Sequence, residues 1–185
     1  MQDGTGDVAS PVILAAGGWL THRFAFSGGD GIVYAVDAQG RLLFHRHPLG
    51  ETALTQALAL SQPAVIRQGG WQDHRRVFGG GDGILYAVDA QGRLLFYRDK
   101  TQNGSGDVAN LSVIGLGGWQ SLERVFSGGG GVLYAVNPEG RLLFYRDKTQ
   151  NGTGDVGSPA VIGEGFGGYK FLFSGGNGVL YGVRP

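Results

Sequence analysis

A unit of about 47 residues recurs four times along this 185-residue chain and constrains its fold more than any other feature. Every unit carries a Gly-Gly-aromatic triplet and then a tyrosine flanked by aliphatic residues, at Tyr34, Tyr86, Tyr134 and Tyr181. Residues 93–104 and 141–152 both read RLLFYRDKTQNG. A repeat of this length is typical of solenoids and propellers, in which each unit is one supersecondary element. We assign the repeats to residues 1–46, 47–98, 99–146 and 147–185 of a single domain.

Each repeat contains short apolar runs separated by turn residues, which in the second repeat lie at 64–67, 76–78, 84–88 and 93–98. The chain has 37 glycines, and an interior glycine costs a helix roughly 1 kcal/mol relative to alanine. Asp82-Gly83 supplies the positive φ angles that tight hairpins require. The run at 84–88 is apolar on both alternating faces, so we expect its sheet to be covered on both sides. This pattern predicts an all-β propeller of four blades with four strands each.

The last repeat lacks one strand type. Leu-Leu-Phe segments occur at 42–44, 94–96 and 142–144, and no fourth copy follows residue 183. We expect the Val-Ile strand type (residues 64–67 in the second repeat) to be innermost and the Leu-Leu-Phe type outermost. The last blade then lacks only its outer strand. The alternative is that the chain pairs with another copy of itself and completes a larger ring.

Charge and composition exclude several classes of protein. Fifteen basic and fifteen acidic residues balance, whereas a nucleic-acid-binding domain carries a cationic surface. There is no cysteine, which excludes disulfides and thiolate chemistry. We find no transmembrane run and no signal peptide in the sequence, and its compartment stays open.

Residues 161–183 read VIGEGFGGYKFLFSGGNGVLYGV, and this unit resembles the repeat of the tachylectin family of β-propeller lectins. The shared order is a Gly-aromatic turn, an FLF strand, a turn with asparagine or glycine, and an LYAV or LYGV strand. The resemblance implies a carbohydrate-binding protein without catalysis or cofactor, whose partners are glycans bearing N-acetylated amino sugars. Such a lectin is secreted or displayed at a cell surface. In the family the sites lie between adjacent blades and use the long loop that joins the outermost strand to the next innermost one.

That loop recurs here as Asn-Gly-Ser-Gly-Asp-Val and its variants, with carboxylates positioned to accept hydrogen bonds from sugar hydroxyls. The candidate ligand-binding residues are Asp7, Val8, Asn103, Gly104, Asp107, Val108, Asn151, Gly152, Asp155 and Val156. A structural alternative is that these side chains bond nearby backbone amides and shape the loop. Calcium binding by alternating oxygens of the same loops is a third possibility, but the acidic residues are too sparse for it. We therefore predict no metal.

A second candidate site uses the repeated aromatic residues, whose rings could pack on a pyranose. Its residues are Trp19, Trp71, Trp119, Tyr169, Asp37, Asp89 and Asn137. The structural alternative makes each tryptophan a wedge between blades. We expect His22 and His74 to be surface residues, and no Ser-His-acid arrangement indicates catalysis. The second functional hypothesis is a structural or protein-interaction propeller without a sugar site, engineered or reconstructed from near-identical repeats.

Overall fold

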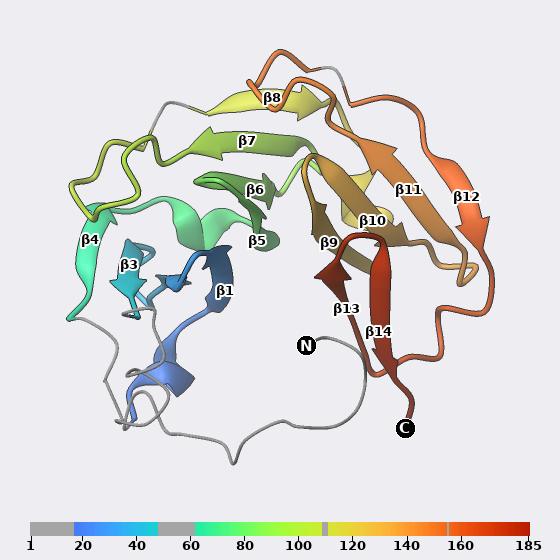
Figure 1. The fold of residues 1–185 in the computed structure, drawn as a ribbon, viewed down its shortest axis with the longest axis horizontal. Coiled ribbons are helices and arrows are strands. Elements are labelled where there is room, and N and C mark those ends of the chain that lie inside the picture. The colour runs from blue at the N-terminus through green and yellow to red at the C-terminus, as the bar shows by residue number, and fades with distance from the viewer. Residues whose placement is uncertain (1–16, 48–61, 109–110, 155) are drawn as a thin grey trace.

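The computed structural model describes residues 17–47, 62–108, 111–154 and 156–185, and it consists of small antiparallel sheets arranged around a centre (Figure 1). Three of these sheets have four strands and one has two. Within each sheet, strands that follow one another in the chain are hydrogen-bonded neighbours. The predicted all-β propeller is therefore confirmed. We call the sheets 1 to 4 in chain order.

The strands fall into four types by their position in the sheet. The innermost strands are β1 (Phe24–Gly29), β5 (Arg76–Gly81), β9 (Arg124–Gly129) and β13 (Phe171–Gly176). The second strands are β2 (Ile32–Val36), β6 (Ile84–Val88), β10 (Val132–Val136) and β14 (Val179–Val183). The third strands are β3 (Leu42–Arg46), β7 (Leu94–Arg98) and β11 (Leu142–Arg146), and the outer strands are β4 (Ala64–Arg67), β8 (Ser112–Gly115) and β12 (Ala160–Gly163).

The expected radial order of the strands is wrong. The Val-Ile type, represented by β4, lies at the outer edge, and β1, β5, β9 and β13 contact one another around the centre. The reason is steric, because a Cβ atom on Gly79 would lie 2.1 Å from the carbonyl oxygen of Ser27. Only strands rich in glycine approach each other this closely at the centre. Among the described residues, sheet 4 accordingly has an inner strand, β13, and a second strand, β14. In the complete sheets a third strand pairs with the second one.

The inner hairpins have the predicted turn geometry. In the hairpin between β1 and β2, Asp30 and Gly31 have φ angles of 47° and 72°, and Asp82 and Gly83 repeat these values at 50° and 72°. Two consecutive positive φ angles define the tight turn that matches the twist of a hairpin. Small residues of the four inner strands surround a central cavity of about 390 Å³ at the ends of these hairpins.

Hydrophobic cores lie between neighbouring sheets. Between sheets 1 and 2, Tyr34 and Phe44 pack with Leu85 and Ala87, all at most 5% exposed. An equivalent core joins sheets 2 and 3. The expectation that the strands of sheet 2 are covered on both faces is therefore confirmed. Within the described ranges, no helix has the length and apolar character needed to cross a membrane.

Candidate functional site

The first candidate site, the loop of residues 99–108, joins β7 to β8 and is fastened to the neighbouring sheet. Its first residue, Asp99, is only 1% exposed and accepts a hydrogen bond from the Tyr34 hydroxyl at 2.9 Å. Burial, and then the charge of Asp99, raises the pKa of Tyr34, which keeps this hydroxyl a donor. Asp147 and Tyr86 form the same pair in the next loop, at 2.8 Å. Loop and neighbouring sheet are thus locked together.

The asparagines of these loops bond their own loop. Asn103 Oδ1 accepts hydrogen bonds from Thr101 Oγ1 and from the Ser105 backbone N–H, both at 2.9 Å. Asn151 makes the matching pair at 2.8 and 2.9 Å. Such side-chain bonds to backbone two residues ahead hold a turn in shape. The geometry is that of the structural alternative.

The remaining loop residues differ in accessibility. Asp107 is exposed, Val108 is 5% exposed, Val156 is half-buried, and Gly104 and Gly152 lie against Phe44 and Phe96 of the preceding sheet. Asp7, Val8 and Asp155 lie outside the described residues. Among the described residues of this set, Asp107 is therefore the carboxylate that a ligand could reach.

The second candidate site is a cavity of about 410 Å³ between sheets 1 and 2. Its lining includes Trp71 and Asp89, two residues of the second candidate site predicted from the sequence. Trp71 begins the short 3-10 turn η2 (Trp71–Asp73), and its ring lies 4.6 Å from that of Tyr97. At 3% exposure Trp71 also fills the space between sheets, as the wedge alternative expects. Arg67 and Leu111 complete the rim from the outer edges of the two sheets.

Two buried polar groups stand beside the aromatic rings of this cavity. Burial would raise the pKa of Asp89, but hydrogen bonds from the Arg93 backbone and guanidinium, at 2.8 and 2.6 Å, outweigh it and hold this pKa below its ordinary value. His74 Nε2 lies 3.1 Å from the Tyr97 hydroxyl. Burial lowers the pKa of His74, against the opposing charges of Asp89 and Asp73. The cavity therefore holds a carboxylate and a neutral imidazole at neutral pH.

The expected surface position of His74 is wrong, because this side chain is only 8% exposed. It lies directly after η2, where it packs with Trp71 at a ring separation of 5.5 Å. Within the described part of the chain its Nδ1 atom is buried and has no hydrogen-bond partner. The sequence did carry a sign of this packing, because His74 follows Trp71 by three residues. In a 3-10 turn, side chains three residues apart lie on the same side of the turn.

The other repeats keep the aromatic pair but change its polar neighbours. Trp119 is 5% exposed and lies 4.5 Å from Tyr145, with Leu122 in place of His74. Trp19 is half-buried and lies 4.8 Å from His45. The remaining candidates are Asp37, which bonds Arg41, Asn137, which bonds the Arg141 backbone, and Tyr169, which is half-buried. The second repeat therefore has its own combination of aromatic and polar groups.

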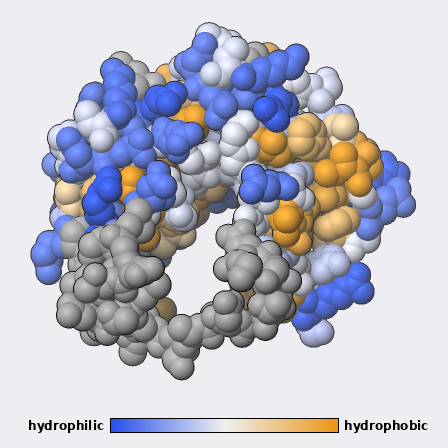
Figure 2. All heavy atoms as spheres, viewed as in Figure 1, coloured by the Kyte–Doolittle hydropathy of each residue, from blue (hydrophilic) through white to orange (hydrophobic). Residues whose placement is uncertain are grey.

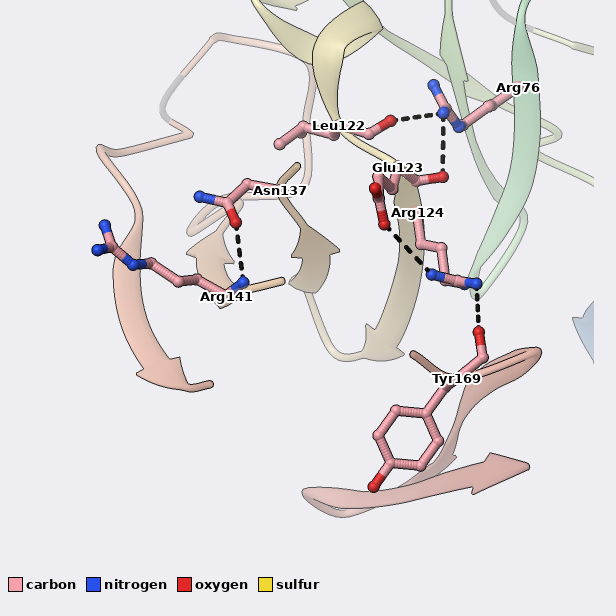
Figure 3. A network of polar contacts seen from close by, with 7 residues as sticks. All are labelled: Arg76, Leu122, Glu123, Arg124, Asn137, Arg141 and Tyr169. Carbon is pink, nitrogen blue, oxygen red and sulfur yellow. Dashed lines mark hydrogen bonds and ion pairs between the residues drawn. The ribbon is translucent and has the colours of Figure 1, made fainter. Parts of the chain in front are cut away.

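Two arginines, at the starts of inner strands β5 and β9, join sheets 2 and 3 to the segment that leads into the next inner strand (Figure 3). Arg76 donates to the carbonyl oxygen of Leu122 at 2.5 Å and to that of Glu123 at 3.2 Å. Arg124 makes the matching bond to the carbonyl oxygen of Tyr169. Burial lowers the pKa of Arg76, although it remains a cation because arginine titrates far above neutral pH. These contacts tie sheet 2 to sheet 3 and sheet 3 to sheet 4.

No group of three His, Cys, Asp or Glu side chains among the described residues is arranged to hold a metal ion. The carboxylates of Asp99 and Asp147 accept hydrogen bonds from a tyrosine and from a backbone N–H of their own loop. These bonds account for the repeated acidic residue that opens each loop.

A family model identifies the family of this chain, and a solved structure shares its fold. A family model described as Tachylectin matches residues 8–157. A solved structure described as "The de novo evolutionary emergence of a symmetrical protein is shaped by folding constraints" aligns with a TM-score of 0.65 and 24% identity, over 92% of this chain and 70% of that one. At this identity the similarity concerns the fold alone. A comparison with curated proteins found no match.

Proposed function

Because this chain belongs to the Tachylectin family, we propose that it is a non-catalytic carbohydrate-binding module for N-acetylated amino sugars. Its lectin-like propeller gives such a module a rigid ring with repeated inter-sheet spaces. N-acetylglucosamine and N-acetylgalactosamine are the proposed ligands, presented on glycans. Several weak sites on one ring gain avidity on a surface that displays many sugars.

The observation that carries this proposal is the cavity of about 410 Å³ between sheets 1 and 2. Sugar sites combine an apolar wall with a few fixed polar groups. Here Trp71 and Tyr97 supply aromatic surface, and Asp89 and His74 supply an acceptor and an imidazole nitrogen. The acetamido group of the ligand offers an N–H and a carbonyl for such partners. We therefore favour the tryptophan end over the 99–108 loop, and we keep Asp107 as the second candidate.

Titration calorimetry with the two sugars, on folded protein, tests this function. We expect binding in the millimolar range, equivalent to a standard free energy of about −4 kcal/mol. Absence of heat up to tens of millimolar, on the order of ten times that dissociation constant, would reject the lectin function. The surviving hypothesis would then be a structural or protein-interaction propeller, which the self-bonded Asn103 and Asn151 favour.

The chain provides matched variants for locating the site. His74→Leu and Asp89→Asn convert the cavity to the residues found in the third repeat, Leu122 and Asn137, so we expect both variants to fold. Together they should weaken sugar binding about tenfold or more, since hydrogen bonds to charged groups contribute about 1.5–3 kcal/mol. As a control, Trp119→Phe changes the tryptophan equivalent to Trp71 in the third repeat, where Leu122 and Asn137 replace the histidine and the aspartate. This variant should leave sugar binding in the cavity beside Trp71 unchanged. If Asp107→Ala abolishes binding while the cavity variants retain it, the loop is the site.

A further inference from the structure

The cavity between sheets 1 and 2 has an arginine at a position where the equivalent strands have glycine. Arg67 is the last residue of β4, whereas β8 and β12 end at Gly115 and Gly163 in the same register. At Gly115 a Cβ atom would lie 2.5 Å from Trp119 Nε1, so a side chain there would displace the tryptophan. Arg67 therefore gives the cavity of the second repeat a cation that the other two sheets lack at this position.

The charge of Arg67 is uncompensated within the described part of the chain, where its guanidinium has no ion pair or hydrogen bond. Three other charged residues line the cavity, namely Arg93, Asp89 and Asp73. Arg93 and Asp89 neutralise each other, since Arg93 Nε lies 2.6 Å from the Asp89 carboxylate. Asp73 is exposed, so water and salt screen its charge. The half-buried Arg67 is thus available to pair with an anionic group of a ligand.

The Tyr97 hydroxyl is a second donor in the same lining. It lies 3.1 Å from His74 Nε2, and one of these two atoms donates to the other. His74 Nδ1 is buried and has no partner among the described residues, and a buried N–H without an acceptor is rarely tolerated in proteins. We therefore assign the ring proton to Nε2, which donates to the Tyr97 oxygen. The Tyr97 O–H is then left to donate to a ligand.

These two donors lie close enough to act on each other. Burial raises the pKa of Tyr97, which keeps its hydroxyl protonated, and the charge of Arg67 opposes this rise. Two donors without an acceptor in one cavity match a carboxylate, since its oxygens accept several hydrogen bonds and arginine binds them as a fork. On the face drawn in Figure 2, polar residues are more frequent over sheets 1 and 2, and hydrophobic residues gather over sheets 3 and 4. A charged ligand suits the polar side.

We propose that this cavity selects N-acetylated amino sugars that also carry a carboxylate, as N-acetylneuraminic acid does, and that Arg67 and the Tyr97 hydroxyl bind this carboxylate. The inference rests on the proposed function and names the substrate class of the same site. Trp71 supplies the surface on which the sugar ring packs. A neutral amino sugar leaves Arg67 without a partner and therefore binds more weakly.

The test compares ligands that differ in one group. Calorimetry on the whole folded chain at neutral pH measures the methyl glycoside of N-acetylneuraminic acid and the methyl ester of the same compound, which lacks the charge. We expect the acid to bind about tenfold more tightly or better, because the ester loses hydrogen bonds between charged groups. Added salt should reduce this ratio. Glucuronic acid, which has a carboxylate but no acetamido group, should bind more weakly than N-acetylneuraminic acid, and equal binding would overturn the selection for N-acetylated sugars.

Protein variants locate the carboxylate. Arg67→Gln should bring the ratio of acid to ester affinity close to one, and Tyr97→Phe, which keeps the ring, should lower it. Arg141→Gln is the matched control, since it removes a 52% exposed cation from the rim of sheet 3, and it should leave the ratio unchanged. Nitrogen NMR of the His74 ring should show the proton on Nε2. A proton on Nδ1 would overturn the assignment of Tyr97 as a donor to the ligand.

The outcomes separate this inference from the proposed function. Equal affinities for acid and ester, in a protein that binds N-acetylglucosamine, would overturn the inference and leave the proposed function standing. An acid preference that survives Arg67→Gln would place the carboxylate elsewhere and would overturn it too. Absence of heat with every sugar would reject both.

Discussion

The interface between sheets 1 and 2 and the open side of sheet 4 are built from nearly the same residues and differ in what covers them. Ile32 and Tyr34 of β2 are 2% and 0% exposed at the interface, whereas Val179 and Tyr181 at the same positions of β14 are 47% and 52% exposed. Both strands form the same hairpin with an inner strand, in the same register. Local sequence therefore determines the hairpin, and burial depends on the neighbouring sheet. Substitutions at equivalent positions should separate these two contributions.

The largest difference is expected for truncation of a core side chain. Ile32→Ala removes a buried side chain from the core between sheets 1 and 2 and should lower the free energy of unfolding by about 2–5 kcal/mol. Val179→Ala, at an exposed position of β14, should lower it by less than about 1 kcal/mol. Urea denaturation monitored by tryptophan fluorescence measures both. Equal losses would show that sheet 4 is as well covered as sheet 1.

The buried tyrosine–aspartate pair should contribute the next largest difference. Asp99→Ala leaves the Tyr34 hydroxyl without its acceptor and should cost about 1–3 kcal/mol of unfolding free energy. Adding Tyr34→Phe should restore part of that loss, because the unpaired donor is then removed. Tyr134→Phe should be close to neutral, since the Tyr134 hydroxyl has no carboxylate acceptor like Asp99 among the described residues. A Tyr134→Phe cost as large as that of Tyr34→Phe would contradict the difference between the two interfaces.

His74 gives the buried interface a pH dependence. Its pKa is lowered from 6.5 in the folded state, so the unfolded chain binds the proton more readily. The contribution of His74 to the free energy of unfolding is therefore complete above pH 6.5, and it is lost as the pH falls through the folded-state pKa of this side chain. Thermal unfolding between pH 7.5 and about 5 should show a steeper loss for the native chain than for His74→Leu. Parallel curves for the two proteins would contradict the assignment.

The smallest effect is expected at the rim of sheet 3. Glu164 lies 4.0 Å from Arg141 with its side chain 80% exposed. Water and salt weaken such a pair, so Glu164→Gln should change the midpoint of urea unfolding by an amount within experimental error. A clear loss would indicate that the outer edges of the sheets are more rigid than their exposure implies.

The repeated sequence predicted much of the fold because the pattern is local. The runs at 64–67, 84–88 and 93–98 became β4, β6 and β7 almost without change, and the family predicted from residues 161–183 is confirmed by the match over residues 8–157. The radial order was harder, since strands apolar on both faces look alike from sequence. The glycine-rich strands are the central ones, because residues such as Gly79 approach the backbone of another inner strand too closely for a side chain.

The candidate sites depended on contacts between repeats, which a single repeat does not display. Tyr34 and Asp99 meet although they lie in different repeats, so the pattern within one repeat does not predict their hydrogen bond. Trp71 and Asp89 were proposed as companions and line one cavity, whereas the roles of both sites in sugar binding stay predictions. His74 was assigned to the surface because a short 3-10 turn was not anticipated between two strands.

Every complete sheet takes strands from two consecutive repeats, since β1 to β3 belong to the first repeat and β4 to the second. Consecutive repeats are thereby joined by hydrogen bonds between strands, and no repeat supplies all four strands of one sheet. A gene duplication that adds one repeat therefore supplies an outer strand for the preceding sheet and three strands for a new one. Each of these strands already fits its neighbours. Growth by whole repeats keeps every junction intact, which explains how near-identical copies can accumulate in one chain without first evolving new contacts.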